Sequence, residues 1–187
     1  MPPKVKFTKE EIISAAVDVT RENGISGLTA RSLAARLGSS AKPIFGWFKN
    51  MEEVQTEVMN SADSYYQSYL KREMNNKQFP PYKASGIAYI KFASEEKELF
   101  KLLFMRDRTG ETIEEDRESI RPLLNIIMQN LNISEDEAFA FHLETWLFVH
   151  GIATMMATSY LNWDMEFVSK SLTDVYLGLK HQYTGGK

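Results

Sequence analysis

The sequence predicts an all-α protein in which a small basic N-terminal part precedes a larger acidic helical part. Apolar residues recur at helical spacing along most of the 187 residues. At Thr8–Glu11 and Ser134–Glu137, a hydroxyl residue is followed three positions later by a glutamate, which is the pattern of a capping box. Glycines and prolines divide the chain into segments of helical length, about nine in total.

The first helix is expected to begin after Thr8, whose hydroxyl can accept a hydrogen bond from the Glu11 amide while the Glu11 side chain reaches back. Phe7 and Ile12 stand at the two positions of a hydrophobic staple. Gly24 can adopt the left-handed backbone that ends a helix. These residues predict a helix from residue 9 to about residue 23.

Two short helices separated by a tight glycine turn are expected next. Thr29 is a suitable N-cap for a helix over residues 30–37, which Gly38 ends. Ser40 can cap a second helix over residues 41–48, where Pro43 is tolerated because first-turn amides have no intrahelical acceptor. Two short helices joined in this way form a helix-turn-helix, whose second helix enters the major groove of DNA.

The charge is distributed unevenly along the chain, although the net charge is only −3. The first fifty residues hold eight Lys or Arg against four Asp or Glu, so the acidic excess lies in the remaining chain. A basic head on an acidic body suits a protein whose head alone meets phosphates. Chance clustering is the alternative explanation.

The run from Leu28 to Gly38, followed by residues 39–54, resembles the signature of the TetR family. There, a Thr-capped helix, a glycine turn, a recognition helix ending in aromatic-x-x-Phe-Lys and an acidic start to the next helix follow in this order. The resemblance covers residues 8 to about 55. It implies a three-helix helix-turn-helix DNA-binding domain over residues 1–50. Residues 51–187 would form a larger helical domain for ligand binding and dimerisation.

The resemblance also implies which residues contact DNA. Phosphate contacts are expected from Thr29 and Lys49, with further candidates at Arg31, Ser40 and Trp47, and base contacts from Ser39, Ala41, Lys42, Pro43 and Phe45. The chemistry agrees in part, because Lys42 can donate to guanine or to phosphate, and Ala41 and Pro43 can touch a thymine methyl group. Packing in the small core explains Phe48 and is an equal alternative for Phe45.

The chain departs from the family pattern at three successive positions. Phe45 stands where the family often has a tyrosine, which removes a phenolic contact with phosphate. Gly46 replaces a larger residue and weakens a helix by about 1 kcal/mol relative to alanine. Trp47 replaces a more usual histidine, although its indole N–H could donate to a phosphate. These departures leave open an alternative function, a helical protein-interaction module with a degenerate DNA-binding head.

The rest of the chain is expected to form further helices. A long helix from residue 52 to about 76 ends before Pro80-Pro81, and helices follow over residues 82–93, 95–105 and 120–131, with a charged mobile loop at 106–116. The apolar stretch 138–161 has about the length of a membrane span. Because His142, Glu144 and His150 would be costly in lipid, a helix buried within the protein is expected instead.

The last two helices, the second of which starts after Asp164, have more apolar surface than one small domain can cover. Pairing with a second copy is the natural remedy, and in the TetR family these helices form a four-helix dimer interface. The expected interface residues are Phe148, Ile152, Met155, Val168, Leu172, Val175 and Leu179. A helix buried within a monomer is the alternative. A dimer would place two recognition helices on a palindromic DNA operator.

Aromatic and methionine side chains in the second part suit an adaptable apolar pocket. The candidate ligand-binding residues are Tyr65, Tyr69, Phe92, Phe104, Met128, His142 and Trp146, for each of which ordinary core packing is the alternative. By analogy with drug- and lipid-responsive members of the family, the ligand would be a small apolar or amphipathic molecule that releases a repressor from DNA. Activation, or repression without a ligand, is not distinguished.

Other function classes are disfavoured by what the sequence lacks. It contains no cysteine and only three scattered histidines, so we expect no metal site and no cofactor. Gly-x-Ser-x-Gly, a glycine-rich phosphate loop and His-Glu-x-x-His are missing, so an enzyme is not expected. The first residues show no signal peptide, and with the absence of cysteine this favours a cytoplasmic protein.

Overall fold

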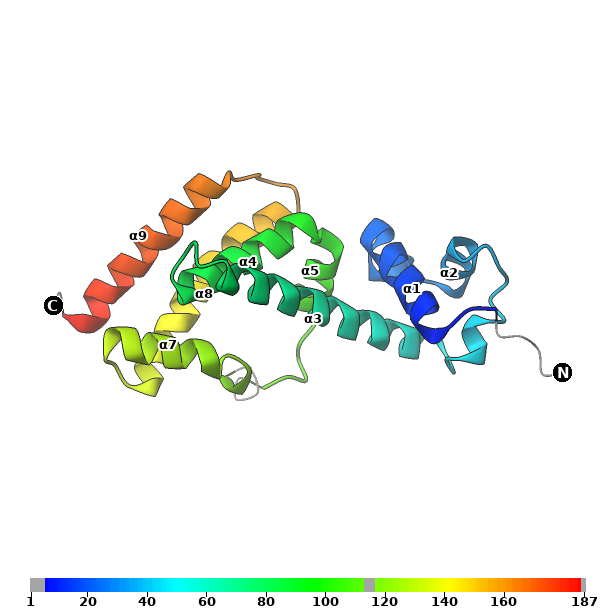
Figure 1. Ribbon diagram of the computed structural model, residues 1–187, viewed down its shortest axis with the longest axis horizontal. Coiled ribbons are helices and arrows are strands. Elements are labelled where there is room, and N and C mark those ends of the chain that lie inside the picture. Colours follow the sequence, from blue (N-terminus) through cyan, green and yellow to red (C-terminus); the bar gives the residue numbers. More distant parts are fainter. Residues whose placement is uncertain (1–5, 113–116, 186–187) are drawn as a thin grey trace. The chain divides into compact units, whose positions relative to one another are not determined.

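A computed structural model describes residues 6–112 and 117–185, and every regular element in these ranges is a helix (Figure 1). The elements are α1 (Lys9–Asn23), η1 (Ile25–Gly27), α2 (Ala30–Arg36), η2 (Ile44–Gly46), α3 (Met51–Asn75), α4 (Pro81–Glu95), α5 (Lys97–Phe104), α7 (Arg121–Leu131), α8 (Glu135–Ala157) and α9 (Met165–Thr184). The all-α prediction is confirmed. Residues 106–112 of the predicted loop are not helical, and its residues 113–116 lie outside the described residues.

The chain forms two compact units, one made of residues up to Gln67 together with Glu96–Arg106, the other of Ser68–Glu95 together with the residues from Asp107 onward. The first unit therefore includes the start of α3 and all of α5. The boundary at residues 50 and 51 is a functional division implied by the family resemblance, and it stays a prediction.

Side-chain caps set the starts of the helices in the first unit. The Thr8 hydroxyl accepts from the Glu11 amide at 3.1 Å, and the Glu11 carboxylate accepts from the Thr8 amide at 2.8 Å. Thr29 and Ser32 form the same reciprocal pair at the start of α2, at 3.1 and 2.9 Å. Gly24, at φ +69°, ends α1 and donates its N–H to the Thr20 carbonyl at 2.8 Å. The side-chain caps predicted at Thr8 and Thr29 are confirmed, as is the end of α1 at Gly24.

The segment over residues 41–48 differs from the predicted α-helix. It is a turn followed by the single 3-10 turn η2, with the Ile44 amide donating to the Ala41 carbonyl at 3.1 Å and the Trp47 amide to the Ile44 carbonyl at 3.0 Å. Pro43 supplies no N–H, and Gly46 has low helix propensity. No side-chain hydrogen bond caps η2 at its start, so the expected cap at Ser40 is not formed. The prediction of a regular α-helix here is wrong, whereas the order of helix, glycine turn and helical segment is retained.

Two glycines of this region should respond oppositely to substitution by alanine. Gly38 has φ +58°, a conformation that disfavours a β-carbon, so Gly38→Ala should lower the free energy of unfolding by about 1 kcal/mol. Gly46 has ordinary backbone angles and open space around the β-carbon position, so Gly46→Ala should raise it by up to about 1 kcal/mol. Denaturant unfolding measures both changes. A loss of stability in Gly46→Ala would contradict the helical conformation assigned to η2.

The second unit surrounds the apolar helix α8 with other helices. Within this unit α8 packs against α4, α7 and α9 (Figure 1). Phe141 and Ala153 of α8 have no exposed surface, and neither do Ile87 and Phe92 of α4. This packing accounts for the apolar composition of α8. In the two described ranges, no helix has the combination of length and hydropathy that crossing a membrane requires.

Candidate functional site

The predicted DNA-contacting residues all lie between Thr29 and Lys49, on or between α2, η2 and the start of α3. The exposed members are Thr29, Arg31, Ser40, Lys42, Phe45, Trp47 and Lys49, and the half-buried members are Ser39, Ala41 and Pro43. Phe45 and Trp47 are each 46 % exposed, whereas Phe48 is 3 % exposed. Phe48 therefore belongs to the core of the head, and Phe45 is available to a partner.

Most cations in the described part of the head, residues 6–49, are paired with carboxylates. The pairs are Lys9 with Glu57 at 2.5 Å, Arg21 with Glu96 at 2.8 Å, Arg36 with Glu22, and Lys49 with Glu53 at 3.7 Å. Hydrogen bonding to the Glu57 side chain raises the pKa of Lys9. Across these same residues, the cations without a carboxylate partner are Lys6, Arg31 and Lys42. The unneutralised positive charge of the head is thus concentrated beside the helix-turn-helix.

Lys49 differs from the other paired cations because its pair is loose. Its side chain is 88 % exposed, and an exposed pair of this i, i+4 type contributes only about 0.3–0.5 kcal/mol. A phosphate could therefore replace Glu53 at little cost. The Thr29 hydroxyl, in contrast, already accepts from the Ser32 amide at the start of α2. A phosphate contact by Thr29 would have to use the remaining capacity of that oxygen.

The indole of Trp47 has a partner within the chain. Its Nε1 donates to the main-chain carbonyl oxygen of Phe7 at 2.9 Å. An indole has a single N–H, so the phosphate contact expected of Trp47 would require this bond to break. The two residues are 40 positions apart, and no local pattern indicates such a contact.

The candidate ligand-binding residues are divided between the two units. Tyr65 and Phe104 belong to the first unit, where Tyr65 lies under the Arg21 guanidinium at 4.5 Å and Phe104 packs on Tyr66 at 5.2 Å. The others belong to the second unit: Tyr69 and Phe92 touch edge to face at 5.4 Å, Met128 packs on a core cluster, His142 bonds to Tyr82, and Trp146 stacks on His150 at 4.7 Å.

Two tyrosine–histidine hydrogen bonds join α4 and α8. The Tyr82 hydroxyl lies 3.1 Å from His142 Nδ1, and the Tyr89 hydroxyl lies 2.9 Å from His150 Nδ1. Burial lowers the pKa of His142 to about 4 and also lowers the pKa of His150. Both imidazoles are therefore neutral at pH 7. Of these four residues the sequence-based prediction named only His142 as a site residue, although the similar spacings along both helices were a usable signal.

The predicted interface residues on α8 and α9 divide by burial. Ile152, Val168 and Leu172 are at most 7 % exposed, so most of their surface is already covered within the protomer itself. Phe148, Val175 and Leu179 are half-buried, and Met155 is 37 % exposed. The most exposed apolar side chains in the two helices are Leu147 at 65 %, Leu177 at 55 % and Phe167 at 45 %. Four of the seven predicted residues therefore keep surface that a second copy could meet, and the interface stays a prediction.

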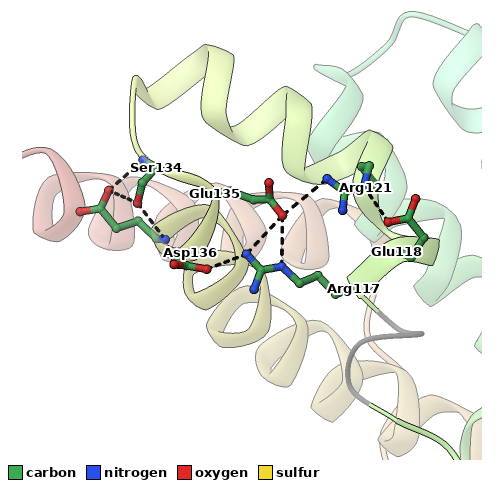
Figure 2. Close-up of polar contacts among 7 residues, drawn as sticks. Arg117, Glu118, Arg121, Ser134, Glu135 and Asp136 are labelled. Carbon is green, nitrogen blue, oxygen red and sulfur yellow. Dashed lines mark hydrogen bonds and ion pairs between the residues drawn. The ribbon is translucent and has the colours of Figure 1, made fainter.

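Ionic contacts fix the start of α8 against the residues around the start of α7 (Figure 2). Arg117 Nη2 lies 2.6 Å from Asp136 and 3.2 Å from Glu135. Arg121 lies 2.8 Å from Glu118 and 3.5 Å from Glu135. Both guanidinium groups are thus matched by carboxylates, which assigns this cluster a structural role.

Comparison with known proteins places this architecture in a family. A family model for the Tetracyclin repressor-like C-terminal domain matches residues 82–175, just over half of the chain. No curated protein matches the sequence.

Solved structures are similar over almost the whole chain. A TetR-like transcriptional regulator from Rhodococcus sp. RHA1 has 14% sequence identity and a TM-score of 0.62, with 96% of each chain covered. A TetR family member from Streptomyces coelicolor A3 has 16% identity and a TM-score of 0.60, with 89% of this chain and 96% of that chain covered. A protein of unknown function from Rhodococcus sp. RHA1 has 17% identity and a TM-score of 0.69, with 98% and 100% covered. At these identities the likeness shows the fold.

The order of helices agrees with the resemblance of residues 8 to about 55, and the family model covers residues 82–175, which include α7 and α8 and nearly all of α4. The members of this family are transcriptional regulators rather than enzymes. This chain belongs to the TetR family of transcriptional regulators.

Proposed function

We propose that this protein is a transcriptional repressor that binds a palindromic operator as a homodimer and is released by a small apolar or amphipathic ligand. The observation that carries the proposal is the unneutralised charge of Arg31 and Lys42 on an exposed helix-turn-helix. Positive charge that no carboxylate offsets is what binding to the DNA backbone requires. Such a regulator acts in the cytoplasm, where its operator lies.

Specific recognition would come from the segment between α2 and the end of η2. Lys42 can donate to the O6 and N7 acceptors of guanine, and the exposed ring of Phe45 can contact a thymine methyl group. Ala41 and Pro43 are half-buried, so part of their apolar surface stays accessible beside Lys42 and Phe45. The hydroxyl groups of Ser39 and Ser40 can bond to either bases or phosphates. Lys49 would bind phosphate in exchange for Glu53.

Dimerisation is supported by the outer faces of α8 and α9 in the second unit. Leu147, Met155 and Leu177 are exposed there without a covering element in the protomer. Gly151 and Gly178 have open space at the β-carbon position, which allows close approach of another helix. A two-fold dimer through these helices would present two equal heads. A palindromic operator follows from that symmetry.

Release by a ligand is supported by the polar groups held within the aromatic interior of the second unit. The neutral imidazoles of His142 and His150, with Tyr82 and Tyr89, can bond to the polar end of an amphipathic molecule. The aromatic side chains of Tyr69, Phe92 and Trp146 belong to the same unit, and they would contact its apolar part if the ligand entered this interior. A ligand that binds better to the conformation with low DNA affinity shifts the population toward it.

A protein-interaction module with a degenerate head is the second candidate, and one observation favours it. The segment expected as an α-helical reader is a 3-10 turn without a side-chain cap. A head of this kind would bind DNA weakly and without sequence preference. Specific binding to a duplex therefore separates the two functions.

Removing Arg31 and Lys42, two of the three cations in residues 6–49 without a carboxylate partner, tests the proposal. Arg31→Ala combined with Lys42→Ala should weaken binding to a duplex enriched from a random pool. It should also make the dependence of log affinity on log salt shallower, by about 1 for each of the two cations that neutralises a phosphate. Fluorescence anisotropy at several salt concentrations measures both. Lys71→Ala, an exposed lysine of α3, is the matched control and should change neither. Unchanged affinity in the double variant would contradict the assigned face.

A further inference from the structure

The short stretch before α1 is fastened at two points to the η2 region. Lys6 Nζ donates to the Ser39 hydroxyl at 3.2 Å, and Phe7 accepts the Trp47 indole N–H through its carbonyl oxygen at 2.9 Å. Ser39 precedes η2 and Trp47 directly follows it. Because Lys6 and Phe7 are consecutive, these two bonds hold the stretch alongside the candidate DNA-binding face.

The ammonium group of Lys6 is held by neutral partners only. It bonds to the Ser39 hydroxyl and lies 5.3 Å from the centroid of the Phe7 ring. Lys9, three residues later, is instead neutralised by Glu57 at 2.5 Å. A hydroxyl and an aromatic ring orient an ammonium group without cancelling its charge. The charge of Lys6 therefore remains available to a phosphate.

The position of Lys6 beside Ser39 adds a third unneutralised cation to Arg31 and Lys42. Ser39 is one of the residues expected to read bases, and Lys6 is exposed. A cation tethered next to a base-reading residue would meet the sugar-phosphate backbone that borders the bases being read. The resemblance to the family signature begins at residue 8, so it assigns no role to Lys6.

We propose that Lys6 is a further DNA-contacting residue whose ammonium group binds an operator phosphate beside the segment 39–43. Trp47 is a positioning residue in this arrangement, because its indole N–H holds Phe7 and thereby the backbone that carries Lys6. The proposal rests on the proposed DNA-binding function and extends the contact surface beyond the helix-turn-helix.

Lys6→Ala should weaken operator binding about fivefold near 0.15 M salt and make the salt dependence shallower by about 1, the effect of losing one phosphate contact. Lys6→Arg should bind like the wild type, because the charge is kept. Lys71→Ala remains the control for loss of a lysine elsewhere. Unchanged affinity and salt dependence in Lys6→Ala would overturn the proposal.

The role of Trp47 has its own readout in a double-mutant cycle. Trp47→Phe keeps an aromatic ring and removes the N–H, and it should weaken binding by no more than Lys6→Ala does. The double variant should bind like Lys6→Ala alone, since both changes disable the same contact. If the fold losses in affinity of the two single variants multiply in the double variant, Trp47 contacts a phosphate independently of Lys6. That result would overturn its positioning role. Circular dichroism and thermal unfolding check that each variant is folded.

Failure of the Lys6 contact can be distinguished from failure of the proposed DNA-binding function. If the wild type enriches no DNA sequence, the DNA-binding function fails and the Lys6 contact fails with it. If the wild type binds an operator and the variant with Arg31→Ala and Lys42→Ala is impaired while Lys6→Ala is not, only the Lys6 contact is overturned.

Discussion

Leu177→Asp is expected to convert the proposed dimer into a monomer while the protomer stays folded. Leu177 is 55 % exposed on α9, so an aspartate there is solvated in the monomer and costs little folding free energy. In a dimer, the carboxylate would be buried against an apolar surface without a partner, a cost of several kcal/mol. Size-exclusion chromatography with light scattering measures the mass.

Leu172→Asp, five residues earlier on α9, is the matched contrast. Leu172 is 6 % exposed and lies against Gly86 of α4. A β-carbon added at Gly86 would be in van der Waals contact with the Leu172 Cδ1 atom, at 3.5 Å. A carboxylate at this position should lower the free energy of unfolding of the protomer by roughly 3–5 kcal/mol. A Leu177→Asp protein that remains a dimer, or a Leu172→Asp protein that is monomeric and fully stable, would show that the faces of α9 are assigned the wrong way round.

Acidification is the second change with a large expected effect. His142 has its pKa lowered by burial from 6.5 to about 4. Between these values the unfolded chain binds a proton that the folded chain does not, so stability is lost as the pH falls through this window. From pH 7.5 to pH 5.0 the loss from this residue should be about 2 kcal/mol. His150, whose pKa is also lowered by burial, should add to the loss in the same direction.

Chemical denaturation of variants at the two pH values isolates the contribution of His142. His142→Gln has no titrating group, so its stability should fall by about 2 kcal/mol less than that of the wild type over this range. It should start from a lower stability at pH 7.5, because the bond to Tyr82 is altered. An identical drop in wild type and His142→Gln would refute the assignment.

The helix starts could be predicted because capping is local. Thr8, Thr29 and Ser134 each bond within three residues, and Asp164 caps α9 in the same way. The type of helix was harder to predict at residues 41–48. Proline and glycine occur close together there, and a regular α-helix competes with a 3-10 turn over only a few hydrogen bonds.

Contacts between distant residues explain what the sequence did not show. Val168, Leu172, Val175 and Leu179 were expected to be covered by a second copy, and Val168 and Leu172 are already buried within the protomer. Periodicity reveals that a face is covered, but not whether the cover is the same chain or a second copy. The bond between Trp47 and Phe7 and the two tyrosine–histidine pairs likewise depend on which helices meet.

The central claim is that the protein is a dimeric, sequence-specific DNA-binding protein, and selection from a random pool of duplexes tests it most directly. At near-physiological salt, the purified dimer should enrich two inverted half-sites whose centres lie about 10–10.5 base pairs apart or a multiple of that spacing. Failure of a folded dimer to enrich any sequence would contradict the claim and favour the protein-interaction function. Enrichment of a single asymmetric site would contradict the symmetric dimer.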